Sequence, residues 1–179
     1  TLTIVSNLGM LYRDLGQLQE AERMFQRALA DCEKALGLDH TLTLTIVSNL
    51  GMLYRALGQL QEAERISQRA LAGREKVLGP DHTDTLTTVN NLGMLYRDMG
   101  QLQEAERMLQ RALAGCEKAL GLDHVLTRTI VSNLGMLYRD LGQFQEAERM
   151  FQQTVAGREK SEHLRSESQI DTTPNNCPP

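Results

Sequence analysis

The chain repeats itself every 42 residues. The segment TLTIVSNLGMLYR begins at Thr1 and returns as TLTIVSNLGMLYR at Thr43, TLTTVNNLGMLYR at Thr85 and TRTIVSNLGMLYR at Thr127. A fixed period of roughly 20 to 50 residues is typical of arrays in which each unit is one supersecondary element. Such units bury their apolar faces by stacking on one another. The sequence therefore predicts units at 1–42, 43–84, 85–126 and 127–160, followed by a disordered tail at 161–179.

Each unit carries two helical patterns. In the first unit, apolar residues follow the i, i+3, i+4, i+7 spacing of an amphipathic helix until Gly16 and Gln17 interrupt it. A second apolar stripe runs from Leu18 to Leu36 and ends at Gly37, a position suited to a left-handed C-cap. A short segment after Gly37 leads to the next unit, and its second copy contains Pro80, which fits a loop. The pattern predicts an all-α stack of about four antiparallel helix pairs.

Two positions within the unit have packing consequences. Glycine recurs in the middle of the first helix, where it costs about 0.5 to 1 kcal/mol relative to alanine, at Gly9, Gly51, Gly93 and Gly135. We expect it to allow close approach of the second helix opposite Ala21 and its equivalents. The slot held by Phe25 becomes Ser67, Leu109 and Phe151 in the later units. The second unit should therefore pack worst.

Composition and charge exclude several functions. The net charge is -4 with interspersed signs, so no continuous basic stripe for nucleic acid is expected. No apolar run approaches the roughly 20 residues of a membrane-spanning helix. The chain begins with Thr1 rather than methionine and has no secretory signal pattern, so we expect a cytoplasmic protein and an excerpt of a longer one.

Catalytic and metal-binding patterns are also missing. The cysteines have no CxxC spacing, and we expect Cys32 and Cys116 to be too distant for a disulfide. His40, His82 and His124 recur in the segment between units, where loop hydrogen bonding is a better interpretation than metal ligation. The sequence has no GxxxxGK[ST] loop. We therefore predict no enzymatic activity and no cofactor.

The helix patterns contain a known motif. Val5-x2-Leu8-Gly9-x2-Tyr12 followed by Ala21-x3-Phe25 resembles the tetratricopeptide signature, with valine in the tryptophan place. The 42-residue unit is similar to that of kinesin light chains, and near-identical copies also resemble arrays in fungal and bacterial NB-ARC and NACHT-type signalling proteins. A HEAT or armadillo array is a distant second. The resemblance implies a right-handed superhelical solenoid that acts as a protein-binding scaffold.

The resemblance also implies a site. In tetratricopeptide arrays the first helix of each unit lines the concave wall, and kinesin light chains use an asparagine ladder there to contact cargo peptide. The matching peptide-binding candidates are Asn7, Met10, Arg13, Asn49, Met52, Arg55, Asn90, Asn91, Met94, Arg97, Asn133, Met136 and Arg139. Carboxamides pair with peptide backbone, guanidinium groups bind carboxylates, and methionine adapts to varied side chains.

Other interpretations of these columns stay open. The asparagines could instead tie neighbouring helices together. Asp14, Asp98 and Asp140 could neutralise the arginines beside them, with Ala56 breaking that acidic column. The repeats could also serve as a self-association or autoinhibitory module of a larger NTPase signalling protein, in which case the groove has no dedicated external ligand. An RNA-binding helical repeat would need a basic groove, which this chain lacks.

Overall fold

The computed structural model describes residues 2–153, with side chains from Asn7 onward, and this part of the chain contains helices and no strand. Residues 144–153 are also helical and follow seven complete helices. These are α1 (Leu2–Asp14), α2 (Leu18–Leu36), α3 (Thr41–Ala56), α4 (Leu60–Leu78), α5 (Thr83–Asp98), α6 (Leu102–Leu120) and α7 (Val125–Asp140). The predicted tail at 161–179 lies outside the described residues.

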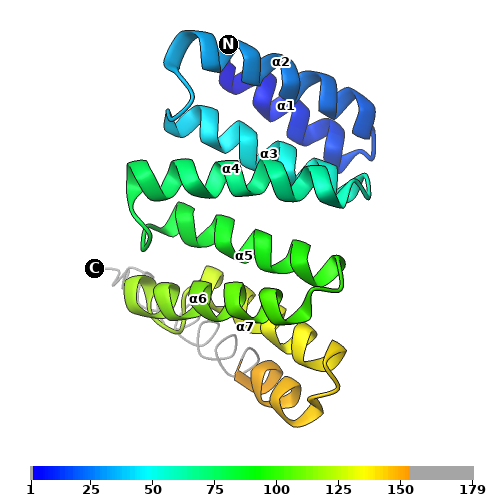
Figure 1. Cartoon of the computed structure of the whole chain (residues 1–179), viewed down its shortest axis with the longest axis vertical. Helices are drawn as coiled ribbons and strands as arrows, with labels where there is room; N and C mark the ends of the chain where they lie inside the picture. Colours follow the sequence, from blue (N-terminus) through cyan, green and yellow to red (C-terminus); the bar gives the residue numbers. More distant parts are fainter. Residues whose placement is uncertain (1, 154–179) are drawn as a thin grey trace, which may run out of the picture.

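The helices form two layers. In Figure 1, each of α2, α4 and α6 lies nearer the viewer than the first helix of its own unit, which is α1, α3 or α5. Each first helix packs on the second helix of its own unit, and each second helix packs on the first helix of the next unit. The predicted all-α solenoid of stacked helix pairs is confirmed.

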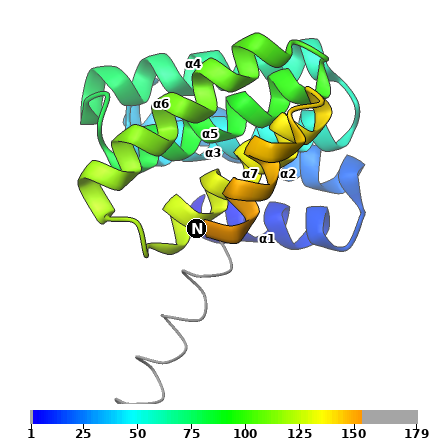
Figure 2. The same cartoon turned by 90° about the horizontal axis from the view of Figure 1, so that it is seen from below.

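The array curves toward the layer of first helices. The backbones of α1 and α3, of α3 and α5, and of α5 and α7 approach one another, whereas α2, α4 and α6 make no such backbone contacts among themselves. Figure 2 shows α1 and α7 on the side of α3 and α5 that faces away from α4 and α6. The first helices therefore form the concave wall, as the resemblance implied.

Glycine ends both kinds of helix, in two different conformations. After α1, the N–H of Gly16 donates to the carbonyl of Arg13 and that of Gln17 donates to Tyr12, which is the Schellman pattern with φ +73° at Gly16. After α2, Gly37 has φ 92° and ψ 171°. The expected left-handed cap at Gly37 is therefore wrong in ψ, although the positive φ still favours glycine.

The mid-helix glycines do permit close helix contact, but mainly with a different residue from the one expected. A Cβ on Gly9 would lie 2.9 Å from Phe25 Cε1, and a Cβ on Gly93 would lie 2.8 Å from Leu109 Cγ. The expected neighbour Ala21 is not among the nearest atoms at Gly9, and only Ala105 of the third unit contributes one, its carbonyl oxygen. Glycine is thus required because the residue-25 slot fills the space where its Cβ would lie.

Burial of the apolar stripe depends on a neighbouring unit. Leu53, Leu95 and Leu137 are fully buried, whereas the equivalent Leu11 of α1 is 53% exposed. Leu11 faces a side of the first unit on which no described residue is stacked. The apolar stripe of one helix pair is therefore completed by the unit before it, as expected for collective stability.

Candidate functional site

The asparagine columns of the concave wall do not lie in one environment. Asn7 is exposed, Asn91 is half-buried, and Asn49, Asn90 and Asn133 are nearly buried at 7%, 6% and 9% exposure. The structure thus brings the predicted ladder to one wall but gives its members unequal access to solvent.

One pair of asparagines ties two units together. Asn133 on α7 donates from Nδ2 to Oδ1 of Asn90 on α5 at 2.8 Å, in a buried hydrogen bond. The position of Asn90 in the preceding unit is held by Ser48, whose hydroxyl oxygen is buried without a hydrogen-bond partner among the described residues. The serine side chain carries a hydroxyl in place of the amide group of asparagine, and it makes no equivalent bond to Asn91.

Asn91 has weak partners instead. Its Nδ2 lies 3.7 Å from the thioether sulfur of Met52 on α3, and its Oδ1 accepts a long bond of 3.4 Å from Nδ2 of Asn90. A thioether sulfur is a weak acceptor. Asn91 therefore has unused hydrogen-bonding capacity at the concave wall.

The methionine column is partly covered. Met10, Met52 and Met136 are half-buried, and Met94 is 8% exposed. Of the methionines predicted to line the groove, Met94 is the least accessible.

The arginine column is neutralised across units rather than within them. Arg55 on α3 donates from Nε to Asp98 on α5 at 2.5 Å, and Arg97 on α5 does the same to Asp140 on α7 at 2.5 Å. The hydrogen bond from Arg97 holds the pKa of Asp140 below its usual range. Arg13 has Ala56 in the matching place and bonds to its own neighbour Asp14 at 2.8 Å. Arg139, which is 57% exposed, lies 3.7 Å from Asp140.

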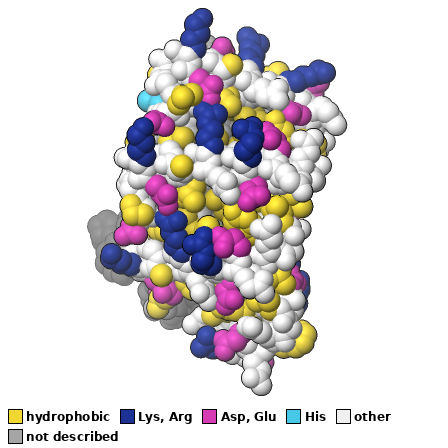
Figure 3. Space-filling view, in the orientation of Figure 1, with side chains coloured by type: hydrophobic (Ala, Val, Ile, Leu, Met, Phe, Trp, Pro, Cys, Tyr) yellow, Lys and Arg dark blue, Asp and Glu magenta, His cyan; other side chains and the backbone are white. Residues whose placement is uncertain are grey.

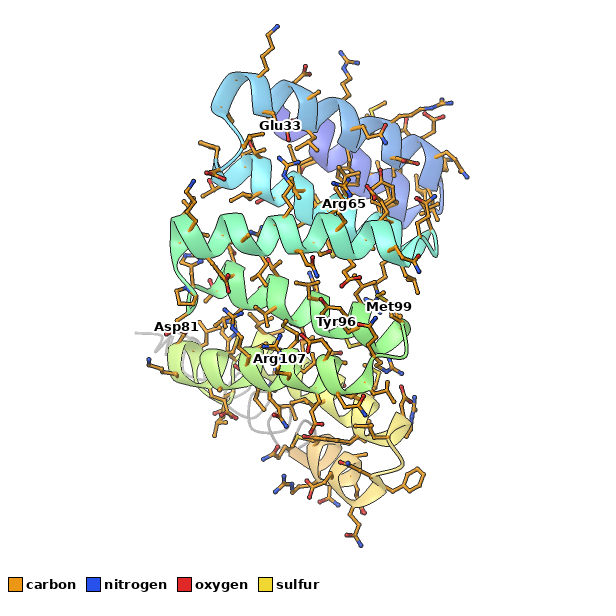
Figure 4. All side chains as sticks on the ribbon, in the orientation of Figure 1. Glu33, Arg65, Asp81, Tyr96, Met99 and Arg107 are labelled. Carbon is orange, nitrogen blue, oxygen red and sulfur yellow. The ribbon has the colours of Figure 1, made fainter. Side chains whose placement is uncertain are left out.

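A second set of polar rungs joins the units on the side of the second helices. Gln68 on α4 donates to the hydroxyl of Tyr96 on α5 at 3.0 Å, and Figure 4 shows Tyr96 between α4 and α6. Burial raises the pKa of Tyr96. Glu33 on α2, labelled in the same figure, pairs with Arg69 on α4. The same ion pair recurs one unit later between Glu75 and Arg111 at 2.6 Å.

The junction between the second and third units contains a buried arginine that the sequence interpretation did not single out. Arg74 on α4 is 7% exposed and stands where the first and third units have Cys32 and Cys116. Its Nη1 donates to Thr88 Oγ1 at 2.7 Å and to the Asp84 carbonyl at 2.9 Å, and its Nη2 donates to Thr45 Oγ1 at 3.3 Å. Thr88 in turn replaces the isoleucine of the other copies. Burial lowers the pKa of the Arg74 guanidinium.

The recurring histidines and cysteines have structural roles. Nδ1 of His40, His82 and His124 accepts the backbone N–H two residues on, at 3.1 to 3.2 Å, and so caps the start of α3, α5 and α7. This confirms the expected loop hydrogen bonding. Cys32 and Cys116 are free and buried, and burial raises the pKa of both thiols. Within residues 2–153, no His, Cys, Asp and Glu side chains gather into a possible metal site.

The outer face has no single-sign patch. Figure 3 shows basic and acidic side chains interspersed over α2, α4 and α6. None of the described helices combines the length and the apolar character needed to cross a membrane.

These features define the class of protein: a curved array of helix pairs whose units are joined by repeated polar rungs. The sequence profile described as "Tetratricopeptide repeat" matches residues 1–76, 42–118 and 84–160. The chain therefore belongs to the tetratricopeptide repeat family. Such repeats generally mediate protein–protein interaction and are typically non-catalytic scaffolds.

Solved structures place the chain beside kinesin-light-chain-like arrays. A Podosopora anserina putative kinesin light chain with nearly identical TPR-like repeats is 29% identical, with a TM-score of 0.77 over 99% of this chain and 79% of that one. BtubC (BKLC) from P. vanneervenii is 24% identical, with a TM-score of 0.78 over 99% of this chain and 67% of that one, and shares the fold. A comparison with curated proteins gave no match.

Proposed function

We propose that this chain binds an extended segment of a partner protein along the concave wall of α3 and α5. The observation that carries the proposal is the state of Asn91, whose amide N–H donates only to a thioether 3.7 Å away and whose side chain is half-buried on the wall. A carboxamide both donates to and accepts from a peptide unit. Asn91 is thus a suitable backbone-binding group, and it is better suited than Asn133, which is already bonded to Asn90.

The residues around Asn91 favour recognition of backbone and apolar side chains. Arg55 and Asp98 neutralise one another nearby, so the wall offers no excess charge to a strongly acidic or basic segment. Met52 adapts its three rotatable bonds to different side chains. This lining fits an extended segment of low net charge.

The test is selection of peptides from a diverse displayed library by the purified chain. We expect the selected peptides to lose roughly tenfold or more in affinity when Asn91→Ala removes the amide, since a hydrogen bond to a buried peptide group is lost. The matched control is Gln61→Ala, which removes an exposed amide from the outer helix α4. It should leave affinity unchanged.

A second variant keeps the Asn91 amide but gives it a hydrogen-bond partner within the chain. Ser48→Asn places at position 48 the same acceptor that Asn90 offers to Asn133, and Asn91 would then bond to it. We expect Ser48→Asn to weaken peptide binding as Asn91→Ala does, with unchanged helicity. Selected peptides that bind both variants as tightly as the parent chain would overturn the proposal. Failure to select any peptide, with concentration-dependent light scattering, would favour the self-association alternative.

A further inference from the structure

The helices α1 and α3 share a sequence but differ in exposure. The segment TLTIVSNLGMLYR occurs unchanged in the first and second units. In the second unit α3 packs on α2 of the preceding unit, and its Leu53 and Tyr54 are 0% and 8% exposed. In α1 the matching Leu11 is 53% exposed and Tyr12 is half-buried. The outer side of α1 therefore has the sequence of a face that stacks on a second helix, and no described residue is stacked on it.

Each internal junction of this kind contains the same polar contact. Between α2 and α3, Gln26 donates to Glu22 at 2.9 Å and to the hydroxyl of Tyr54 at 3.3 Å. That hydroxyl donates to Glu22 at 3.1 Å. The bond from glutamine to the tyrosine hydroxyl recurs at the next two junctions. A glutamate and glutamine pair on one unit thus receives the tyrosine of the next.

The fourth unit carries a copy of this pair to which no tyrosine is bonded. Gln152 donates to Glu148 at 3.2 Å, and both side chains are exposed. Phe151 beside them is half-buried, whereas the equivalent Phe25 is fully buried. The chain contains four tyrosines, and three of them are bonded to the earlier pairs. Among the described residues, Tyr12 is thus the tyrosine that matches the pair in the fourth unit.

The charges of the two faces are complementary as well. At two internal junctions an arginine of one first helix donates to an aspartate of the next first helix. Arg139 on α7 is 57% exposed and lies 3.7 Å from Asp140, which already accepts from Arg97. A first unit stacked after the fourth would set Asp14, whose side chain is 63% exposed, at the corresponding place relative to Arg139.

We propose that this chain associates head to tail with further copies of itself, the outer side of α1 in one copy packing on residues 144–153, the receiving face, in another. The partner is a second copy because the two faces are the two halves of a junction that the array already forms three times. They lie at opposite ends of the array (Figure 1). An interface between two different faces does not close in a dimer. The concave wall of α3 and α5 stays open, so this association is independent of the proposed function.

Sedimentation of the purified chain over a range of concentrations tests the proposal. We expect the mean mass to rise with concentration past that of a dimer. Leu11→Asp buries an unpaired charge in the junction and should weaken association by roughly a hundredfold or more, with unchanged helicity. Leu122→Asp is the matched control, because this leucine is 67% exposed in the loop between α6 and α7. It should associate as the parent does. A parent chain that stays monomeric or stops at a dimer, or equal association of the parent and Leu11→Asp, would overturn the proposal.

A mixing experiment tests which faces meet. The Leu11→Asp chain keeps the receiving face, so it should bind the α1 end of a parent assembly and stop its growth. Added to labelled parent chain, it should lower the mean mass of the labelled assemblies, whereas Leu122→Asp should not. Tyr12→Phe removes the hydroxyl offered to Glu148 and Gln152, and it should weaken association by roughly two- to tenfold. Equal effects of Leu11→Asp and Leu122→Asp on the labelled chain, or unweakened association of Tyr12→Phe, would contradict the assignment of the faces.

Discussion

The junction between the second and third units and the junction between the third and fourth have the same backbone but different interiors. In the former, the guanidinium of Arg74 donates to Thr88 across α4 and α5. In the latter, Cys116 and Ile130 hold the equivalent positions and are fully buried. Near-identical copies can therefore stack in one geometry with either an apolar or a hydrogen-bonded seam, provided that both sides of the seam change together.

The second unit also differs from the third within its own helix pair. Its α4 carries Ser67, where α6 of the third unit carries the fully buried Leu109. Both differences place polar groups on α4 where the other described units have apolar ones. Among the complete second helices, α4 is thus the least apolar, although its unit has neighbours on both sides.

The largest effect should come from making the third unit resemble the second. Leu109→Ser removes a fully buried leucine opposite Gly93, and large-to-small core changes cost about 2 to 5 kcal/mol. Chemical denaturation followed by circular dichroism measures the change in free energy of unfolding. A loss below about 0.5 kcal/mol would mean that the slot contributes little to stability.

The effects of substituting Arg74 and Thr88 on stability should be coupled. Thr88→Ile alone removes the acceptor 2.7 Å from Arg74 Nη1, and leaving a buried donor unpaired costs about 1 to 3 kcal/mol. Adding Arg74→Cys recreates the apolar junction seen at Cys116 and Ile130. Buried polar groups replaced by packed apolar ones are often neutral or stabilising. We expect the double variant to regain at least the stability of the parent chain. Additive losses in a double-mutant cycle would refute the coupling.

Restoring a larger apolar side chain at position 67 should stabilise the chain by less than Leu109→Ser destabilises it. Ser67→Leu restores the residue type of the third unit, and we expect a gain of about 1 to 3 kcal/mol, because part of the slot already contains the serine side chain. The melting temperature and the denaturation midpoint both report it. An unchanged or lowered melting temperature would contradict the packing interpretation. Ser67→Thr, which keeps the hydroxyl and adds one methyl group, is the matched control and should give a smaller gain.

The smallest effect should come from completing the row of arginine and aspartate rungs. Ala56→Asp supplies the carboxylate that Arg13 lacks in the second unit, as Asp98 and Asp140 do for Arg55 and Arg97. Because these side chains are partly exposed, we expect a gain of only about 0.2 to 1 kcal/mol. The gain should shrink when salt is raised, since salt screens exposed ion pairs. A gain that is independent of salt would point to helix propensity at position 56 instead.

Much of the fold could be predicted from the sequence because the same spacing of apolar residues and glycines recurs in all four units. The helix ranges, the loops containing His40 and Pro80, and the need for glycine at Gly9 follow from spacing and composition. Contacts between helices were harder to predict. The identity of Phe25 as the group facing Gly9 depends on the depth to which the side chain reaches, and ψ at Gly37 depends on the path of the chain into the next unit.

The candidate site was less predictable, because one residue at a neighbouring position decides each side chain's role. Asn91 and Asn133 occupy the same column, but Asn90 engages Asn133 while Ser48 leaves Asn91 to Met52. Arg13 and Arg55 likewise differ only because Ala56 faces one and Asp98 faces the other. The copy-to-copy differences at Asn90 and Ala56 were the signal that could have separated these roles.

The seam at Arg74 and Thr88 also bears on how the number of units can change. Removing residues 85–126 would set Arg74 opposite Ile130, and removing residues 43–84 would set Cys32 opposite Thr88. Removing both units together, residues 43–126, would set Cys32 opposite Ile130, which restores a matched apolar seam. We expect the free energy of unfolding, divided by the number of units that remain, to be lower after the 42-residue deletion of 85–126 than after the 84-residue deletion. Among internal deletions, removal of the second and third units together is therefore the one that leaves a matched apolar seam.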